Sequence, residues 1–170
     1  MTNDVASLGV NEVLAVASER TGGLEDLGDG PFVEPLGRLV DSLARDGQLN
    51  DIGRLISNER MLLHTVNRLG YARDRATISN IAEQKIVRPV FIIGMPRTGT
   101  TILHDILAQD PDSRAPLTWE VMFPSPPPQR DTFETDPRIA MCEATFPGRD
   151  LQLPGFDAIH PMGAQLTQEC

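Results

Sequence analysis

The residues whose types and spacing suggest chemistry lie in the stretch Gly-Met-Pro-Arg-Thr-Gly-Thr-Thr at positions 94–101. Two glycines and a proline predict a tight turn there. The apolar, largely β-branched run at 90–93 predicts a short strand buried on both faces. The spacing of apolar residues after the turn predicts an amphipathic helix over 100–108. A strand, a glycine-bearing turn and a helix together form an anion cradle, because loop N–H groups and the positive end of the helix dipole converge.

The cation of this loop distinguishes it from the loop of nucleotide hydrolases. The spacing Gly94-x-x-x-x-Gly99 matches their phosphate-binding loop, which continues with Lys and then Ser or Thr. Here Thr100 and Thr101 follow instead, and the cation lies inside the loop as Arg97. Its planar, always-charged guanidinium suits bidentate contact with sulfate or phosphate oxygens. The sequence therefore predicts an anion-binding loop like that of nucleotide hydrolases, but with a different cation and so a different reaction.

This stretch resembles the 5′-phosphosulfate loop of PAPS-dependent sulfotransferases, which carry Pro-Lys/Arg-Ser/Thr-Gly-Thr-Thr at the same junction. The matching residues here are 96–101, preceded by Phe-Ile-Ile-Gly at 91–94. The chain is similar to the bacterial branch of that family over most of residues 89–170. The further matching stretches are 103–111, 115–120, 124–128 and 160–170.

The resemblance implies an α/β, P-loop-containing nucleotide-binding fold of the sulfotransferase type. Residues 89–170 would form the first part of that domain, and residues 1–88 a helical flank or cap. Helical periodicity supports the flank. The apolar residues of its predicted helices span 10–17, 36–43, 49–69 (ending near Gly70) and 78–86. A further short helix is predicted after Asp136-Pro137.

Two parts of such a fold have no counterpart in the sequence. No second clear buried strand follows Ile93, although a doubly wound sheet needs several parallel strands. The resemblance also implies an arginine and a serine on a later strand and helix, which hold the adenosine 3′-phosphate. We therefore expect the chain to be the N-terminal portion of a longer sulfotransferase and to be inactive alone.

The activity implied by the resemblance is transfer of a sulfuryl group from PAPS to a hydroxyl or amine, without a metal. Such a transfer needs mainly positioning and electrostatic stabilisation. Arg97 would neutralise the leaving phosphate and the transferring group. Thr98, Gly99, Thr100 and Thr101 would hold the 5′-phosphate at the helix N-terminus. The acceptor class stays open between a small molecule, a lipid and a glycan.

A base must take the proton of the acceptor hydroxyl. Glu120 is the candidate, because a glutamate of the corresponding segment has this role in several sulfotransferase branches; the alternative is that it only caps a helix or faces solvent. His104, one helical turn after the two threonines, is the rival. His160 falls in a predicted loop and receives no role.

Composition limits the other function classes. Hydrophobic content of 40% and a mean hydropathy of −0.20 are typical of a globular protein. A net charge of −9 argues against nucleic-acid binding, and residues 89–170 hold 11 acidic against 5 basic side chains. No membrane span or secretory signal is found, which favours the cytoplasm and free thiols at Cys142 and Cys170.

Two other functions remain open. The first is a P-loop small-molecule kinase that uses ATP, which the lack of lysine after Gly99 disfavours. The second is a non-catalytic helical module whose glycine loop binds some other anion or only shapes a turn.

Overall fold

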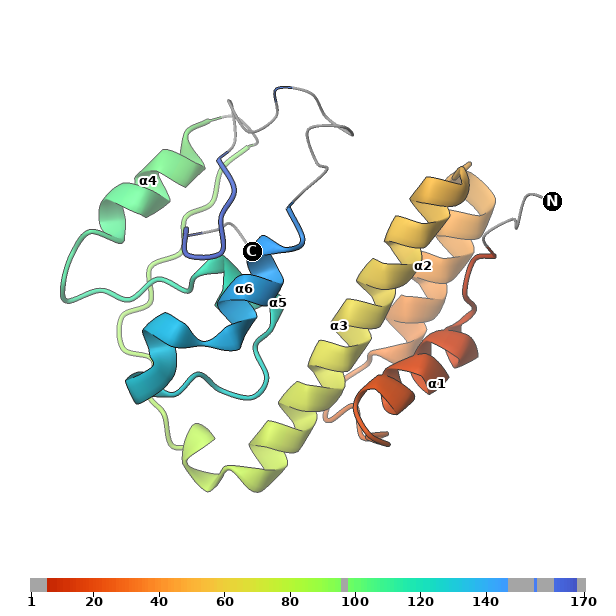
Figure 1. Cartoon of the computed structure of the whole chain (residues 1–170), viewed down its shortest axis with the longest axis horizontal. Helices are drawn as coiled ribbons and strands as arrows, with labels where there is room; N and C mark the ends of the chain where they lie inside the picture. Colours follow the sequence, from red (N-terminus) through yellow and green to blue (C-terminus); the bar gives the residue numbers. More distant parts are fainter. Residues whose placement is uncertain (1–5, 96–97, 147–154, 156–160, 168–170) are drawn as a thin grey trace. The chain divides into compact units, whose positions relative to one another are not determined.

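The computed structural model describes residues 6–95, 98–146, 155 and 161–167. These belong to two compact units, Met1–Glu83 and Gln84–Cys170 (Figure 1). In the described parts of the chain, no helix combines the length and the apolar character that crossing a membrane would need.

The described residues of the first unit form three α-helices and one 3₁₀ turn. The α-helices are α1 (Val10–Arg20), α2 (Val33–Asp46) and α3 (Asp51–Thr77). Asn50 caps α3, since its side chain accepts a 2.8 Å hydrogen bond from Gly53 N. One apolar side chain from each of the first two helices packs on two from α3. These core residues are Val13, Leu36, Met61 and Leu62.

Polar contacts hold α1 and the residues just before it against α3. Asn58 is buried, and its side chain accepts from Leu8 N at 3.1 Å and donates to Ala6 O at 2.9 Å. Arg20 at the end of α1 makes a bidentate pair with Glu59, with both N···O distances 3.0 Å. The predicted helical flank therefore has its own core and its own polar ties.

The predicted ends of two helices are wrong. The third helix does not end near Gly70 but continues to Thr77, because Gly70 and Asp74 lie on its buried side. Packing there outweighs the roughly 1 kcal/mol that a mid-helix glycine costs. The predicted fourth helix is only a 3₁₀ turn, Ser79–Ile81. Ile86 is 84% exposed, and without a buried face a short helix is not stable in water.

The second unit is built around a small aromatic core. Its elements are α4 (Thr100–Leu107), α5 (Thr118–Met122), the 3₁₀ helix η2 (Arg130–Thr135) and α6 (Pro137–Glu143). The α4 and α6 predictions are confirmed. Trp119, Cys142 and Ala164 are fully buried together, and Cys142 is a free thiol. The ring of Phe133 lies 5.3 Å from that of Trp119, centroid to centroid.

The predicted buried strand at 90–93 is wrong for this structure. The described residues contain no strand, only an isolated antiparallel bridge between Leu117 and Thr167. Val90, Phe91 and Ile93 are 78%, 80% and 94% exposed. The physical reason is that the backbone N–H and C=O groups of a strand must pair with a neighbouring strand. The α/β class is therefore not seen in the described residues, which are mainly helical.

Candidate functional site

The glycine loop ends where α4 begins. Gly99 is the residue before the helix and has φ +92°, a left-handed conformation that side chains rarely adopt. The backbone N–H of Leu103 donates to Gly99 O at 3.1 Å, which closes the first turn. The loop thus delivers the chain directly into a helix N-terminus, the end that attracts anions.

Gly94 lies close to the other end of the loop. A Cβ at this position would lie 2.8 Å from Thr100 Cγ2 and 2.9 Å from Thr98 Oγ1. The Thr98 hydroxyl in turn donates to Met95 O at 2.6 Å. Gly94 therefore lies close to the start of α4, and any larger residue at position 94 would require Thr98 or Thr100 to move.

The structure brings four of the predicted binding residues together at the entrance of α4. Thr98 and Gly99 are exposed, and Thr100 and Thr101 are partly buried in the first turn. Arg97, the predicted cation, lies outside the described residues, as does its neighbour Pro96.

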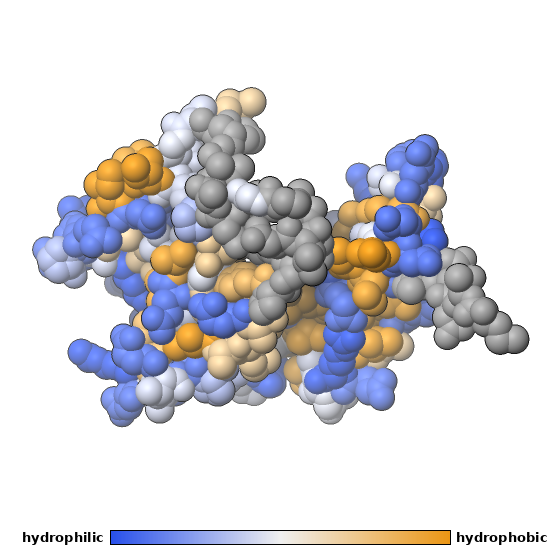
Figure 2. All heavy atoms as spheres, turned by 45° about the horizontal axis from the view of Figure 1, so that its top comes forward, coloured by the Kyte–Doolittle hydropathy of each residue, from blue (hydrophilic) through white to orange (hydrophobic). Residues whose placement is uncertain are grey.

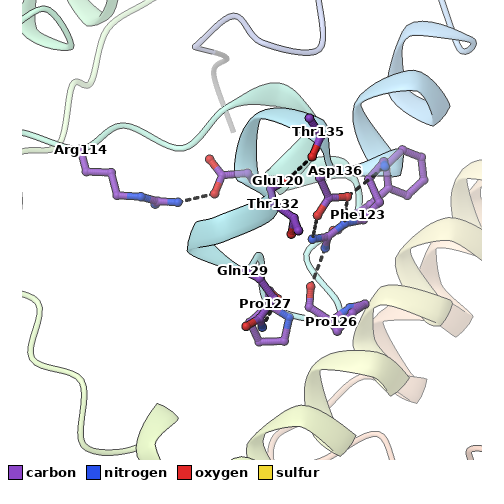
Figure 3. A network of polar contacts seen from close by, with 10 residues as sticks. Arg114, Glu120, Phe123, Pro126, Pro127, Gln129, Thr132, Thr135 and Asp136 are labelled. Carbon is purple, nitrogen blue, oxygen red and sulfur yellow. Dashed lines mark hydrogen bonds and ion pairs between the residues drawn. The ribbon is translucent and has the colours of Figure 1, made fainter.

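Glu120, the candidate base, is held in a defined position on α5. Its carboxylate accepts a 2.9 Å hydrogen bond from Leu117 N, so it forms a cap at the start of this helix. It also pairs with Arg114 (Figure 3). The side chain is 8% exposed, against 66% for that of Arg114. The predicted capping role is thus present, and a role as base stays a prediction.

A short C-terminal segment ties α4 to the helix of Glu120. The hydroxyl of Thr167 donates to Asp105 on α4, and Thr167 bridges to Leu117 just before α5. Leu166 O accepts from both Thr118 N at 3.0 Å and Thr118 Oγ1 at 2.9 Å. The loop helix and the helix of the candidate base therefore belong to one connected unit.

Of the three histidines in the sequence, two were considered for the site, and the structure describes one of these two. His104 lies in the second turn of α4 and is partly buried. His160 is outside the described residues. Among those residues, no group of three or more His, Cys, Asp and Glu side chains could hold a metal ion.

Sequence reasoning missed a buried ion pair next to this site. Asp136 and Arg138 face each other with N···O distances of 2.6 and 2.8 Å, and the guanidinium lies 4.8 Å from the Trp119 ring centroid. Arg138 Nη1 also donates to Phe123 O at 2.8 Å and to Pro126 O at 2.5 Å (Figure 3). The hydrogen bonds from Arg138 lower the pKa of Asp136 from its ordinary value. An Asp-Pro-Arg sequence predicts a helix cap, but it does not predict that the aspartate and the arginine form a buried ion pair.

This pairing has an electrostatic consequence for an anion site. Arg114 and Arg138 are two of the five basic residues in the 89–170 segment, and both are already engaged by carboxylates. Neutralised guanidinium groups attract a distant anion little. Residues 89–170 therefore offer fewer cations to an anion than their five basic side chains suggest.

Comparison with known proteins finds similarity to sulfotransferases. The family model described as "Sulfotransferase family" matches residues 89–170. The structure is similar to the crystal structure of sulfotransferase STF1 from Mycobacterium tuberculosis H37Rv, with 31% identity and a TM-score of 0.79. The match covers 98% of this chain and 46% of that chain. No protein with a curated description matches significantly.

Both comparisons agree with the resemblance that the loop carries. The family match begins one residue before the apolar run at 90–93 and includes the glycine loop, α4 and α5. The structural match extends over both units and spans less than half of the mycobacterial protein. The chain is thus similar to sulfotransferases in sequence over residues 89–170 and in structure over 98% of its length.

Proposed function

We propose that this chain contributes the phosphosulfate-binding part of a sulfotransferase that moves a sulfuryl group from PAPS to a hydroxyl or amine acceptor. The observation that carries the proposal is the bend from Gly94 to Gly99, which leads into the N-terminus of α4. Phosphate and sulfate groups bind where backbone N–H groups and a helix dipole converge. The acceptor is a small molecule, a lipid or a glycan, and the setting is the cytoplasm.

The residues of the loop fit the anionic end of PAPS. An added Cβ at Gly94 would occupy space beside Thr98 and Thr100, so the bend depends on the absence of a side chain there. The amides of Thr98 to Thr101 would bind the 5′-phosphate, and Arg97 would stabilise the charge that develops as the sulfuryl group leaves. PAPS, when bound, supplies the activated sulfuryl group.

Glu120 is the residue that we propose as base. Its position is fixed by Leu117 N and Arg114. A carboxylate that is already held in place loses little conformational entropy when it accepts a proton from the acceptor. The link from Asp105 through Thr167 to Leu117 supports a constant relation between α4 and α5.

In a longer, active sulfotransferase that contains this segment, Glu120→Gln is expected to lower turnover at least a hundredfold with less than a twofold change in affinity for PAP. A general base contributes about 10²–10⁴-fold to rate, while glutamine keeps one oxygen for the Leu117 N–H. The measurement is PAP release from PAPS with simple alcohol and phenol acceptors. Glu134→Gln, an exposed acid of η2, is the control. Unchanged turnover would remove Glu120 as base and leave it the cap of α5.

The proposal as a whole is tested by calorimetric titration of the chain with PAP and with ATP and Mg²⁺. We expect PAP to bind and Arg97→Ala to weaken it by roughly ten- to hundredfold, as charge-assisted contacts contribute about 1.5–3 kcal/mol. Arg130→Ala, an exposed arginine outside the loop, should leave affinity unchanged. Preference for ATP and Mg²⁺ would favour a kinase, and no nucleotide binding a non-catalytic module.

A further inference from the structure

Helix α3 carries a row of side chains that the core of the first unit does not use. Its members lie three or four positions apart, so each is the neighbour of the next on the helix surface. The row consists of Ile52, Ile56, Arg60, His64, Arg68, Tyr71 and Arg75. All are exposed except Arg68, which is partly buried. The row is about 35 Å long, because an α-helix rises 1.5 Å per residue.

The arginines of this row are not neutralised by carboxylates. Arg60 and Arg75 form no ion pair among the residues that the structure describes. Arg68 donates through Nε to Leu27 O at 2.5 Å and through Nη2 to Asp29 O. These carbonyl groups satisfy its N–H groups without removing its charge. The row, which contains no acidic residue, is therefore a positive surface on a chain whose net charge is −9.

The acidic side chains of α3 beside the row are already engaged. Glu59 pairs with Arg20 and Asp74 pairs with Arg73, at N···O distances of 3.0 and 2.7 Å. The other acidic residues beside the row belong to the loop 25–29, which contacts it through carbonyl groups. The row therefore keeps the positive charge of its arginines.

Tyr71 contacts two of these arginines. The guanidinium carbons of Arg68 and Arg75 lie 5.8 and 5.6 Å from its ring centroid, so the ring holds both cations at the surface without neutralising them. Tyr71 is 46% exposed. Tyrosine and arginine each combine an apolar body with a polar end, which suits them to the boundary between water and lipid.

The other end of the row is apolar. Ile52 and Ile56 are 62% and 37% exposed, and Arg60 follows one helical turn later. Figure 2 shows hydrophobic side chains at the surface of the first unit, at the right of the view, beside hydrophilic ones. Exposed aliphatic residues next to arginines are typical of helices that lie on a bilayer. The aliphatic groups enter the acyl boundary there, and the cations stay among the headgroups.

We propose that this row of α3 docks the chain on the surface of a bilayer that carries anionic phospholipids. The arginines bind the lipid phosphates, and the two isoleucines enter the headgroup region. A nucleic acid would use the arginines but would gain nothing from the isoleucines. A second copy of this chain would place like charges against each other. A lipid acceptor, one of the three classes left open above, would be reached from such a surface.

The test is co-sedimentation of the chain with vesicles. One set contains phosphatidylcholine alone, and the other also contains about 30% phosphatidylglycerol, which makes the surface potential negative. We expect at least about tenfold tighter binding to the anionic vesicles. Most of this difference should be lost in about 0.5 M salt, where the screening length falls to about 4 Å. No nucleotide is added, so the result is independent of the proposed sulfuryl transfer.

Variants at exposed positions identify the surface that binds. Arg60→Gln with Arg75→Gln should weaken binding to the anionic vesicles by about twentyfold, since one arginine near such a surface contributes roughly fivefold. The matched control is Arg38→Gln with Arg45→Gln, which removes the same charge from α2 and should change binding less than about twofold. Ile52→Ser should weaken binding by about threefold or more, because it removes apolar area from the bilayer contact.

A normal unfolding curve for each variant shows that its fold is retained. Equal binding to the neutral and the anionic vesicles, or no binding to either at low salt, would overturn the proposal. An equal loss in the α2 control and in the row variant would also overturn it. Binding to double-stranded DNA that is as tight as binding to the anionic vesicles, and that Ile52→Ser leaves unchanged, would assign the row to nucleic acid instead.

Discussion

Asp136→Asn is expected to lower the free energy of unfolding of the second unit by about 3–5 kcal/mol at neutral pH, the usual cost of removing one partner of a buried ion pair. The side chains of Asp136 and Arg138 are 9% and 10% exposed. The variant would leave the Arg138 guanidinium buried against the Trp119 ring with two carbonyl acceptors and no counter-charge.

The Asp136→Asn variant tests the charge alone, because asparagine can still cap α6. Asp136 Oδ1 accepts from Arg138 N at 3.0 Å and so caps α6, and asparagine caps helices as well as aspartate does. Trp119 is the one tryptophan of the sequence and lies beside the pair, so its fluorescence reports unfolding of this unit. Asp131→Asn, an exposed residue of η2, is the matched control and should change stability by less than about 0.5 kcal/mol.

The same pair predicts the sign of a pH dependence. Hydrogen bonding to Arg138 lowers the pKa of Asp136 below its ordinary 3.8. A depressed pKa stabilises the fold above the ordinary value, and this contribution is lost as pH falls through the folded-state pKa. The stability difference between the chain and Asp136→Asn should therefore be largest at neutral pH and shrink below about pH 4. A difference that is constant with pH would show that the charge is not what stabilises the unit.

The sequence predicted well those elements whose stabilising contacts are local. The α1 and α4 helices have apolar residues at helical spacing and glycines near one end, and both signals act within a few residues. The position of Gly94 and Gly99 similarly predicted the bend before α4. In these cases the residues that decide the conformation are neighbours in the chain.

What could not be predicted depends on residues far apart in sequence. The α3 helix continues past Gly70 because of burial, which periodicity does not reveal. The segment 90–93 has the composition of a buried strand, yet its conformation depends on neighbours that the described residues do not contain. Arg114 pairs with Glu120, and Arg138 reaches Phe123 O, and neither contact follows a regular spacing.

Gly94→Ala is expected to weaken PAP binding by about ten- to hundredfold. The new Cβ would lie 2.8 Å from Thr100 Cγ2 and 2.9 Å from Thr98 Oγ1, distances at which atoms must move apart. Both neighbours are threonines, whose branched side chains have few other rotamers. We expect the bend to open and the Thr98 hydrogen bond to Met95 O to be lost, and a ten- to hundredfold weaker binding corresponds to about 1.4–2.7 kcal/mol of binding free energy.

Calorimetric titration with PAP measures this effect, with Gly37→Ala as the matched control. A Cβ at Gly37 would meet Val10 Cγ2 at 3.8 Å, an ordinary contact, and alanine is the better helix former inside α2. The control should bind PAP normally and be equally or more stable. If Gly94→Ala also bound PAP normally, the narrow bend would not be the phosphate site. Weak binding with an unchanged unfolding curve would tie affinity to the shape of the loop, because the substitution touches only exposed or partly buried residues at the entrance of α4.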